Sequence, residues 1–167
     1  MNALVQSVSV AVQKPTWGQI IQLRQQQAPV DVAGIARDMG LRVWEMQLPS
    51  GISGKIFKDP LNGGDSGYSI GINSSEGFLR KRFTVAHEIA HFVLHRDKIG
   101  DELSDDAMYR SGLSTREEVA ANRLAADILM PAPLIIKMKS QGCDDESKMA
   151  AALQVSEAAM HIRLSYL

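Results

Sequence analysis

The sequence predicts an α+β fold in which helices surround a small, mostly antiparallel sheet. Three short runs of strand-forming residues lie close together in the first half of the chain. They precede an apolar helix that carries three of the chain's four histidines, and then a helix with alanines along one face. The 167 residues are 45% hydrophobic, which is enough apolar surface for one buried core. We therefore expect one globular unit, with a core over 1–131 and a C-terminal helical segment over 132–167 packed on it.

Charge and cysteine content exclude several classes of protein. Eighteen basic and nineteen acidic side chains leave a net charge of −1, so no overall field favours nucleic acid or an anionic membrane. The one cysteine, Cys143, excludes an internal disulfide and a cysteine-cluster metal site. Residues 1–14 have neither a basic leader nor an unbroken apolar run, and we expect a short edge strand or a loose arm there. A cytoplasmic location with no membrane partner is the expectation.

Local signals place the elements that come before the histidine helix. Thr16 and Gln19 form a capping box for a helix over 17–27, and Gly40 ends a second helix over 30–39. The expected strands cover 41–48, 51–59 and 66–73, with a turn rich in Pro, Asn, Gly and Asp at 60–65.

The second half of the chain is expected to be helical. Basic residues at 80–82 are expected in a loop that leads into the histidine helix over 84–95. The polar segment 96–114 is expected to be an exposed excursion. The next helix should begin near Ser114 or Thr115 and end before Pro131. Further helices should follow, with a break at 141–147.

The stretch FTVAHEIAHFVLH, residues 83–95, contains a pattern that is typical of a metal site. His87 and His91 stand four residues apart, so on a helix they share one face about one turn apart and can reach one metal ion. Glu88 lies beside them, and the pattern H-E-x-x-H is the zinc-protease signature. The alternative is a core helix with partnered histidines, but its apolar surroundings leave the imidazoles and the carboxylate little solvent.

A catalytic zinc site takes three protein ligands and an open position, so a third ligand must come from another element. Glu118 heads one face of the next helix, and the face continues with Ala121, Asn122, Ala125 and Leu129. In a competing interpretation Glu118 closes a capping box with Thr115. Ser114 and Glu117 form an equally good box and leave Glu118 free. The residues alone leave both interpretations open.

The two motifs together resemble the ImmA/IrrE family of metallopeptidases. HEIAHFVLH is followed by EEVAANRLAADILMP, which is similar to the family's second motif at Glu118, Ala121, Asn122, Ala125 and Met130-Pro131. Leu124 replaces the family's usual aromatic, a departure that affects packing and not ligation. The resemblance implies a zincin-like fold, Glu118 as the third ligand, and zinc as the metal, with manganese or another divalent ion as an alternative.

The resemblance also implies peptide hydrolysis, and residues can be assigned to its steps. Glu88 is the expected general base and then general acid. Asn122, one turn after Glu118, is the expected orienter of a ligand. Tyr109 is a candidate oxyanion donor, and Arg110 beside it has the charge for the same role; for both, a surface position without a catalytic role is the alternative.

Two further features are assigned to a substrate cleft. The strand over 66–73 comes just before the histidine helix, and we expect it to line the cleft and pair with an extended substrate through Tyr68, Ser69, Ile70 and Gly71. A central strand of the sheet would show much the same residues, so that alternative stays open. His95 has rotated about 80° from His87 around the helix, so it is expected at the pocket rim or in the core and not as a fourth ligand.

Members of the resembled family cleave regulatory proteins, which makes a helix-turn-helix repressor or an antitoxin the expected partner. The setting would be a stress-response, mobile-element or toxin–antitoxin system. Two rivals remain: a catalytically silent binding module, and a DNA-binding regulator that acts through a helix-turn-helix at 148–167. Charge opposes the second rival, because four basic and four acidic residues balance over 132–167 and phosphate contacts need basic side chains.

Overall fold

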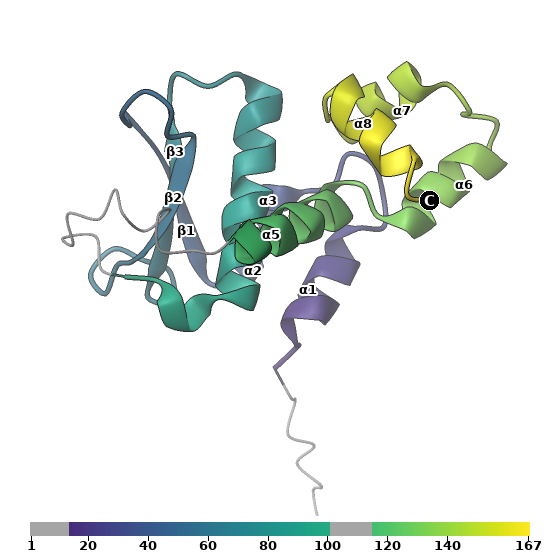
Figure 1. Cartoon of the computed structure of the whole chain (residues 1–167). Helices are drawn as coiled ribbons and strands as arrows, with labels where there is room; N and C mark the ends of the chain where they lie inside the picture. The colour runs from purple at the N-terminus through teal and green to yellow at the C-terminus, as the bar shows by residue number, and fades with distance from the viewer. Residues whose placement is uncertain (1–13, 101–114) are drawn as a thin grey trace, which may run out of the picture.

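A computed structural model describes residues 14–100 and 115–167 of the chain (Figure 1). The helices are α1 (Trp17–Arg24), α2 (Val32–Asp38), α3 (Phe78–Leu94), the short 3-10 helix η1 (Arg96–Lys98), α5 (Thr115–Leu129), α6 (Ala132–Ser140), α7 (Glu146–Leu153) and α8 (Glu157–Leu164). The strands are β1 (Leu41–Met46), β2 (Gly54–Lys58) and β3 (Tyr68–Asn73). The predicted N-terminal arm and the candidate donors Tyr109 and Arg110 lie outside the described residues.

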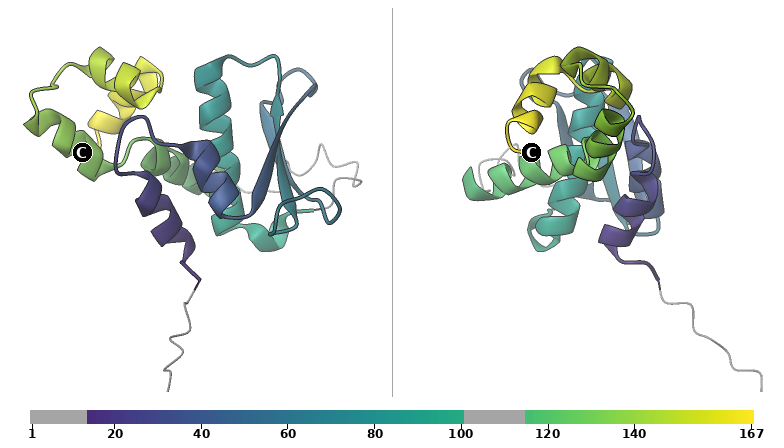
Figure 2. Two further views of the ribbon diagram at one scale, coloured as in Figure 1. Left: turned by 180° about the vertical axis from the view of Figure 1, so that it is seen from behind. Right: turned by 90° about the vertical axis from the view of Figure 1, so that its right-hand side faces the viewer.

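The long helix α3 runs beside the sheet, and α5 crosses α3 (Figure 1). Seen from behind, α2 lies against α3 and β1, while α6, α7 and α8 gather on the side of α5 away from the sheet (Figure 2). The predicted α+β class is confirmed. Buried side chains of the sheet, α3, α5 and the C-terminal helices form one hydrophobic cluster. A division of the chain at residue 131 stays a prediction.

The predicted capping box at Thr16 and the predicted helix stop at Gly40 are confirmed, whereas α1 ends at Arg24, before the predicted residue 27, and α2 begins at Val32, after the predicted residue 30. The hydroxyl of Thr16 accepts a hydrogen bond from the backbone N–H of Gln19, whose side chain accepts from the backbone N–H of Thr16 in return. Asp31 caps α2 by accepting from the backbone N–H of Gly34. Gly40 follows α2 with φ +76°, a left-handed conformation that favours glycine and stops the helix.

The sheet has the order β1-β3-β2 and is mixed, which corrects the prediction of a mostly antiparallel sheet. β2 and β3 are antiparallel neighbours, whereas β1 pairs with β3 in parallel. The chain passes from β1 to the far edge of the sheet and returns through β3 to the centre. Alternation of apolar and polar residues reports burial on one face and is the same for both strand directions, so the sequence could not reveal this crossing.

The central place of β3 overturns its predicted pairing with an extended substrate. Residues 68–73 pair with β1 along one edge, and residues 68–72 pair with β2 along the other. All six residues of β3 are buried. A strand whose two edges are already hydrogen-bonded cannot add another strand, so Tyr68, Ser69, Ile70 and Gly71 cannot bind a substrate through their backbone.

Helix α3 begins at Phe78, well before the predicted start, so residues 80–82 are helical and do not form a loop. Gly77 provides the extended N-cap conformation. Arginine and lysine are good helix formers, and their charges are satisfied without leaving the helix. Lys81, for example, donates to the carboxylate of Glu45 over 2.9 Å.

The C-terminal helices are tied to the rest of the molecule by two partly buried guanidinium groups. Arg82 of α3 donates to the backbone carbonyls of Val30 and of Gln154, which ends α7. Burial lowers the pKa of Arg82. Arg163 of α8 donates to the carbonyl of Met130 and lies 2.7 Å from the carboxylate of Asp127. The predicted break after α6 is confirmed over residues 141–145, although α7 already begins at Glu146, within the predicted range of 141–147.

The segment Thr115–Ser140 is long and apolar enough to cross a membrane by length and composition alone. The helix breaks at Pro131, and 44% of the most apolar window is buried inside the fold. Core helices of soluble proteins have the same properties. The absence of a membrane partner stays a prediction.

Strand β2 approaches α3 very closely at Gly54. A Cβ added to this glycine would lie 2.3 Å from the Thr84 methyl of α3 and 2.9 Å from the backbone oxygen of Gly71. Thr84 is β-branched and stiff, and the second neighbour is backbone, so neither can move aside cheaply. The glycine therefore sets the distance between the edge of the sheet and the histidine helix.

We expect Gly54→Ala to lower the free energy of unfolding by about 1–3 kcal/mol, because β2 and α3 must separate to admit the methyl group. The control is Gly18→Ala, in a helical position with no heavy atom within 4 Å. It should raise the free energy of unfolding by about 0.5–1 kcal/mol. Urea denaturation measures both, and equal effects of the two substitutions would contradict this packing.

A chain of hydrogen bonds runs from the partly exposed Trp44 across the sheet to the buried carboxylate of Asp59. The indole N–H of Trp44 donates to the hydroxyl of Ser69, which donates to Asp59 over 2.8 Å. The backbone N–H of Asn62 donates to the other carboxylate oxygen. The Asn62 contact first, and then the Ser69 hydroxyl, lower the pKa of Asp59 below its ordinary value.

A depressed pKa in the folded state means that ionised Asp59 stabilises the fold above its unfolded-state pKa of about 3.9. That stabilisation is lost as the pH falls through the lower, folded-state pKa. We therefore expect Asp59→Asn to lower the Tm at pH 7, and we expect this effect to shrink progressively as the pH falls below about 4. Thermal melts over this pH range test it, with Asp144→Asn in an exposed loop as the control. A constant difference at all pH values would contradict the assignment.

Candidate metal centre

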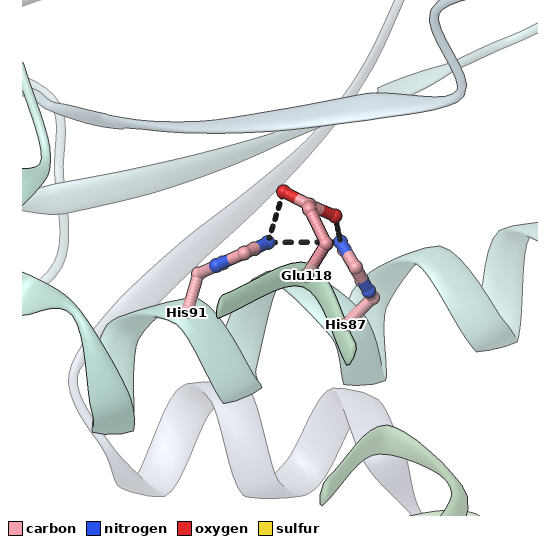
Figure 3. Close-up of side chains that lie close together, drawn as sticks. All are labelled: His87, His91 and Glu118. Atoms are coloured by element: carbon pink, nitrogen blue, oxygen red, sulfur yellow. Dashed lines mark hydrogen bonds and ion pairs between the residues drawn. The ribbon is translucent and has the colours of Figure 1, made fainter. Parts of the chain in front are cut away.

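Two histidines of α3 and one glutamate of α5 converge on a single point (Figure 3). Nε2 of His87 lies 2.9 Å from Nε2 of His91. The two carboxylate oxygens of Glu118 lie 3.5 Å from these nitrogens, one oxygen on each. Among the described residues these three side chains form a group that could hold a metal ion, with their ligand atoms within 4.8 Å of one another. The geometry thus brings together the three ligands that the sequence motifs predict.

The alanines of α5 explain how Glu118 reaches the histidines. Ala121 and Ala125 are completely buried, and their small side chains let α5 pack closely against α3. Glu118 stands one turn before Ala121 on the same side, so its carboxylate projects over the α3 face that carries the histidines. Thr115 is already inside α5, and Glu118 faces the histidines, which resolves the earlier alternative in favour of a ligand position.

The neighbouring glutamate has a different contact. Glu117 forms an ion pair with Lys98 of η1, and this contact raises the pKa of Lys98. The pair joins the start of α5 to the segment that follows α3. Consecutive carboxylates on one turn therefore have separate partners, Glu117 on η1 and Glu118 on the histidines.

The separations of the donor atoms fit a metal ion. In a tetrahedral zinc site with metal–ligand distances of about 2.0–2.1 Å, two ligand atoms lie about 3.3 Å apart. The observed separations of 2.9 and 3.5 Å lie on either side of that value. Two imidazoles and one carboxylate are also the donor set of a common class of catalytic zinc site. A divalent ion would offset the cost of burying these polar groups in an apolar helix.

Glu88 is buried, with 3% of its surface exposed, and lies under the first residue of β2. A Cβ at Gly54 would stand 3.6 Å from a carboxylate oxygen of Glu88. The sequence motif predicts the chemical role of Glu88, but it does not predict that Gly54 of β2 covers this side chain. The close approach of Gly54 to α3 therefore shapes the space around the candidate general base, and the role of Glu88 stays a prediction.

Aromatic rings form a row along one side of α3. Phe83 stacks on His87 with ring centroids 6.2 Å apart, and His87, His91 and His95 follow at one-turn intervals. His95 is buried, and its Nδ1 lies 3.2 Å from Nδ1 of His91, on the side of that ring away from the other ligands. It lies outside the group of three ligands, as predicted. Sequence reasoning missed its contact with His91, although the four-residue spacing signals it.

The structure gives less support to the prediction that Asn122 orients a metal ligand. The residue is exposed on α5, and in the described part of the chain its side chain makes no hydrogen bond to Glu118 or to the two histidines. Its predicted role as an orienter of a ligand stays a prediction.

Comparison with known proteins agrees with this geometry. Residues 36–165 match the family described as the IrrE N-terminal-like domain, a peptidase family. A segment of 69 residues is 46% identical to the radiation response metalloprotease IrrE of Deinococcus radiodurans. That segment covers 40% of this chain and 20% of the Deinococcus protein.

The fold is also similar to a solved structure of a Mycobacterium tuberculosis transcriptional regulator, with a TM-score of 0.59 and 15% sequence identity. The match covers 89% of this chain and 45% of the mycobacterial one. This chain thus spans less than half of each relative, and the second likeness concerns the fold alone. Since the family match covers most of the chain and includes all three ligands, the protein belongs to the IrrE N-terminal-like family of metallopeptidases.

Proposed function

We propose that this chain is a zinc-dependent endopeptidase that cleaves a regulatory protein at a specific site. The observation that carries the proposal is the convergence of Glu118 on His87 and His91, from a helix that follows α3 only after a long intervening segment. Membership of a metallopeptidase family supports the reaction class. The donor set supports zinc, and manganese or another first-row divalent ion is the alternative.

The residues divide the work of peptide hydrolysis among them. A divalent ion held by His87, His91 and Glu118 would supply Lewis-acid activation of water and of the scissile carbonyl. Glu88 accepts the proton of the attacking water and delivers it to the leaving amine. Its burial beneath Gly54 keeps the carboxylate away from bulk solvent, which strengthens its interactions with charge that develops nearby.

We infer that the substrate is a helix-turn-helix repressor or an antitoxin and that the protein acts in the cytoplasm. The resemblance of both motifs to the ImmA/IrrE family supports this substrate class. The relative from Deinococcus radiodurans is described as a radiation response metalloprotease, which is in keeping with a regulatory role in a stress response. The single cysteine and the near-neutral net charge are in keeping with the cytoplasm.

Metal content should depend on Glu118 and not on the adjacent Glu117. We expect about one zinc per chain in the wild type by native mass spectrometry. Glu118→Ala removes a direct ligand, so its zinc affinity should fall by more than the 10- to 100-fold that is typical of outer-shell substitutions. Glu117→Ala, which breaks the ion pair with Lys98, should weaken binding by less than about tenfold. Equal losses in the two variants would argue against Glu118 as a ligand.

Glu88→Gln should separate chemistry from metal binding. The amide cannot accept the proton, so cleavage should slow by about 10²–10⁴-fold while zinc content stays at the wild-type level. The substrates are candidate repressors and antitoxins incubated with the zinc-loaded protein, and products are identified by mass spectrometry. Glu157→Gln, an exposed position on α8, is the charge-matched control. An unchanged effect of Glu88→Gln protein on its partner would favour a silent binding module.

A further inference from the structure

His95 contacts Nδ1 of the metal ligand His91, the ring nitrogen that points away from the metal site. The H-E-x-x-H motif assigns no role to His95. We propose that His95 is a positioning residue that fixes the tautomer of His91, so that Nε2 of His91 presents its lone pair to the metal. This inference rests on the metal site of the proposed function. It concerns a residue outside the ligand set, and its test has readouts other than catalytic activity.

The His91 ring has partners at both of its nitrogens. Its Nε2 faces Nε2 of His87 and the carboxylate of Glu118, and its Nδ1 faces Nδ1 of His95 at 3.2 Å. His91 is 3% exposed and His95 is 9% exposed. With so little contact with solvent, water cannot easily replace either partner, so the proton of His91 must be arranged within the protein.

Counting protons gives the direction of the hydrogen bond. A neutral imidazole carries one N–H, and the nitrogen that binds a metal must present its lone pair. If Nε2 of His91 is the ligand atom, its proton resides on Nδ1 and is donated to Nδ1 of His95. His95 must then accept at Nδ1 and carry its own proton on Nε2. The opposite arrangement would place a proton on Nε2 of His91 and block metal binding.

The end of α3 holds the His95 ring in place for this contact. The backbone N–H of His95 donates to the carbonyl of His91 over 2.7 Å, and the carbonyl of His95 accepts from the backbone N–H of Lys98. The guanidinium of the next residue, Arg96, lies 5.0 Å and 4.9 Å from the ring centres of Tyr68 and Phe92. These contacts fix the turn that carries the His95 ring.

An imidazole is an unusual acceptor for this position. A ligating histidine generally donates its second N–H to a carboxylate, a backbone carbonyl or a water molecule, and a carboxylate raises the basicity of the ligand. A neutral imidazole fixes the orientation of His91 without adding negative charge. With an imidazole as the acceptor, no carboxylate acts on the metal through His91. Glu118 is then the one negatively charged ligand, and a bound cation would keep more of its Lewis acidity.

The first test needs no substitution. Long-range ¹H–¹⁵N NMR of the zinc-loaded wild type distinguishes protonated from unprotonated ring nitrogens. We expect a protonated Nδ1 on His91 and an unprotonated Nδ1 on His95. A protonated Nδ1 on His95, or independent tautomers in the two rings, would overturn the proposal.

The second test compares three variants by zinc competition with a chelator and by the absorption spectrum of the Co²⁺-loaded protein. His95→Leu removes the acceptor and should weaken zinc binding by about 10- to 100-fold and change the cobalt spectrum. His95→Asn places an amide oxygen where Nδ1 stood and should recover most of the affinity and the wild-type spectrum. His161→Leu removes the exposed histidine of α8 and should change neither.

The outcomes separate the two proposals. Wild-type affinity and spectrum in His95→Leu, or equal losses in His95→Leu and His95→Asn, would show that the acceptor has no role and would overturn this inference alone. If the wild type itself binds neither zinc nor cobalt, the metal site of the proposed function is wrong, and the role of His95 is wrong with it. Thermal melts of each variant show whether it is folded.

Discussion

The contact between α3 and α5 is the constraint on which the site depends. The metal-binding face of α3 supplies only two ligands, and a third must come from a helix that is distant in sequence. The buried alanines of α5 permit the close crossing, and the Glu117–Lys98 ion pair ties the first turn of α5 to the segment after α3. The orientation of one short turn therefore determines whether Glu118 lies over the histidines or elsewhere on the surface.

The buried polar side chains of α3 each require a partner, and the neighbouring elements supply these partners. An apolar helix that buries imidazoles and a carboxylate is costly unless each group has a partner. In this structure the partners are provided in sequence along the helix: Glu118 for His87 and His91, and His91 for His95. The sheet covers Glu88 through Gly54, where only a glycine fits. Backbone thus bounds the site at Gly54, and the small side chains of α5 bound it where α5 crosses α3.

Sequence reasoning succeeded where the signal is local. The H-E-x-x-H spacing fixes which side chains share a helix face, so His87 and His91 could be identified without any tertiary information. The capping box at Thr16 and the stop at Gly40 were similarly local and correct. Glu118 was different, because its spacing suited a cap and a ligand equally well. Only the resemblance to a known family, and then the structure, separated the two.

The errors arose where the answer depends on contacts between distant segments. Strand alternation does not distinguish parallel from antiparallel neighbours, so the sheet order and the central place of β3 were not accessible. Residues 80–82 looked like a polar loop because their partners, such as Glu45, lie far away in sequence. The four-residue spacing indicates that His95 contacts His91. The consequence of this contact becomes evident only in the structure, where Nε2 of His91 faces His87 and Glu118 and leaves Nδ1 to face His95.

The central claim is that one metal ion is held jointly by α3 and α5. Anomalous diffraction at the zinc absorption edge, from crystals grown with one equivalent of zinc, tests it most directly. We expect a single peak within bonding distance, about 2.0–2.2 Å, of Nε2 of His87, Nε2 of His91 and an oxygen of Glu118. A peak at another position, such as the exposed His161–Glu146 pair, with none between the two helices, would contradict the claim.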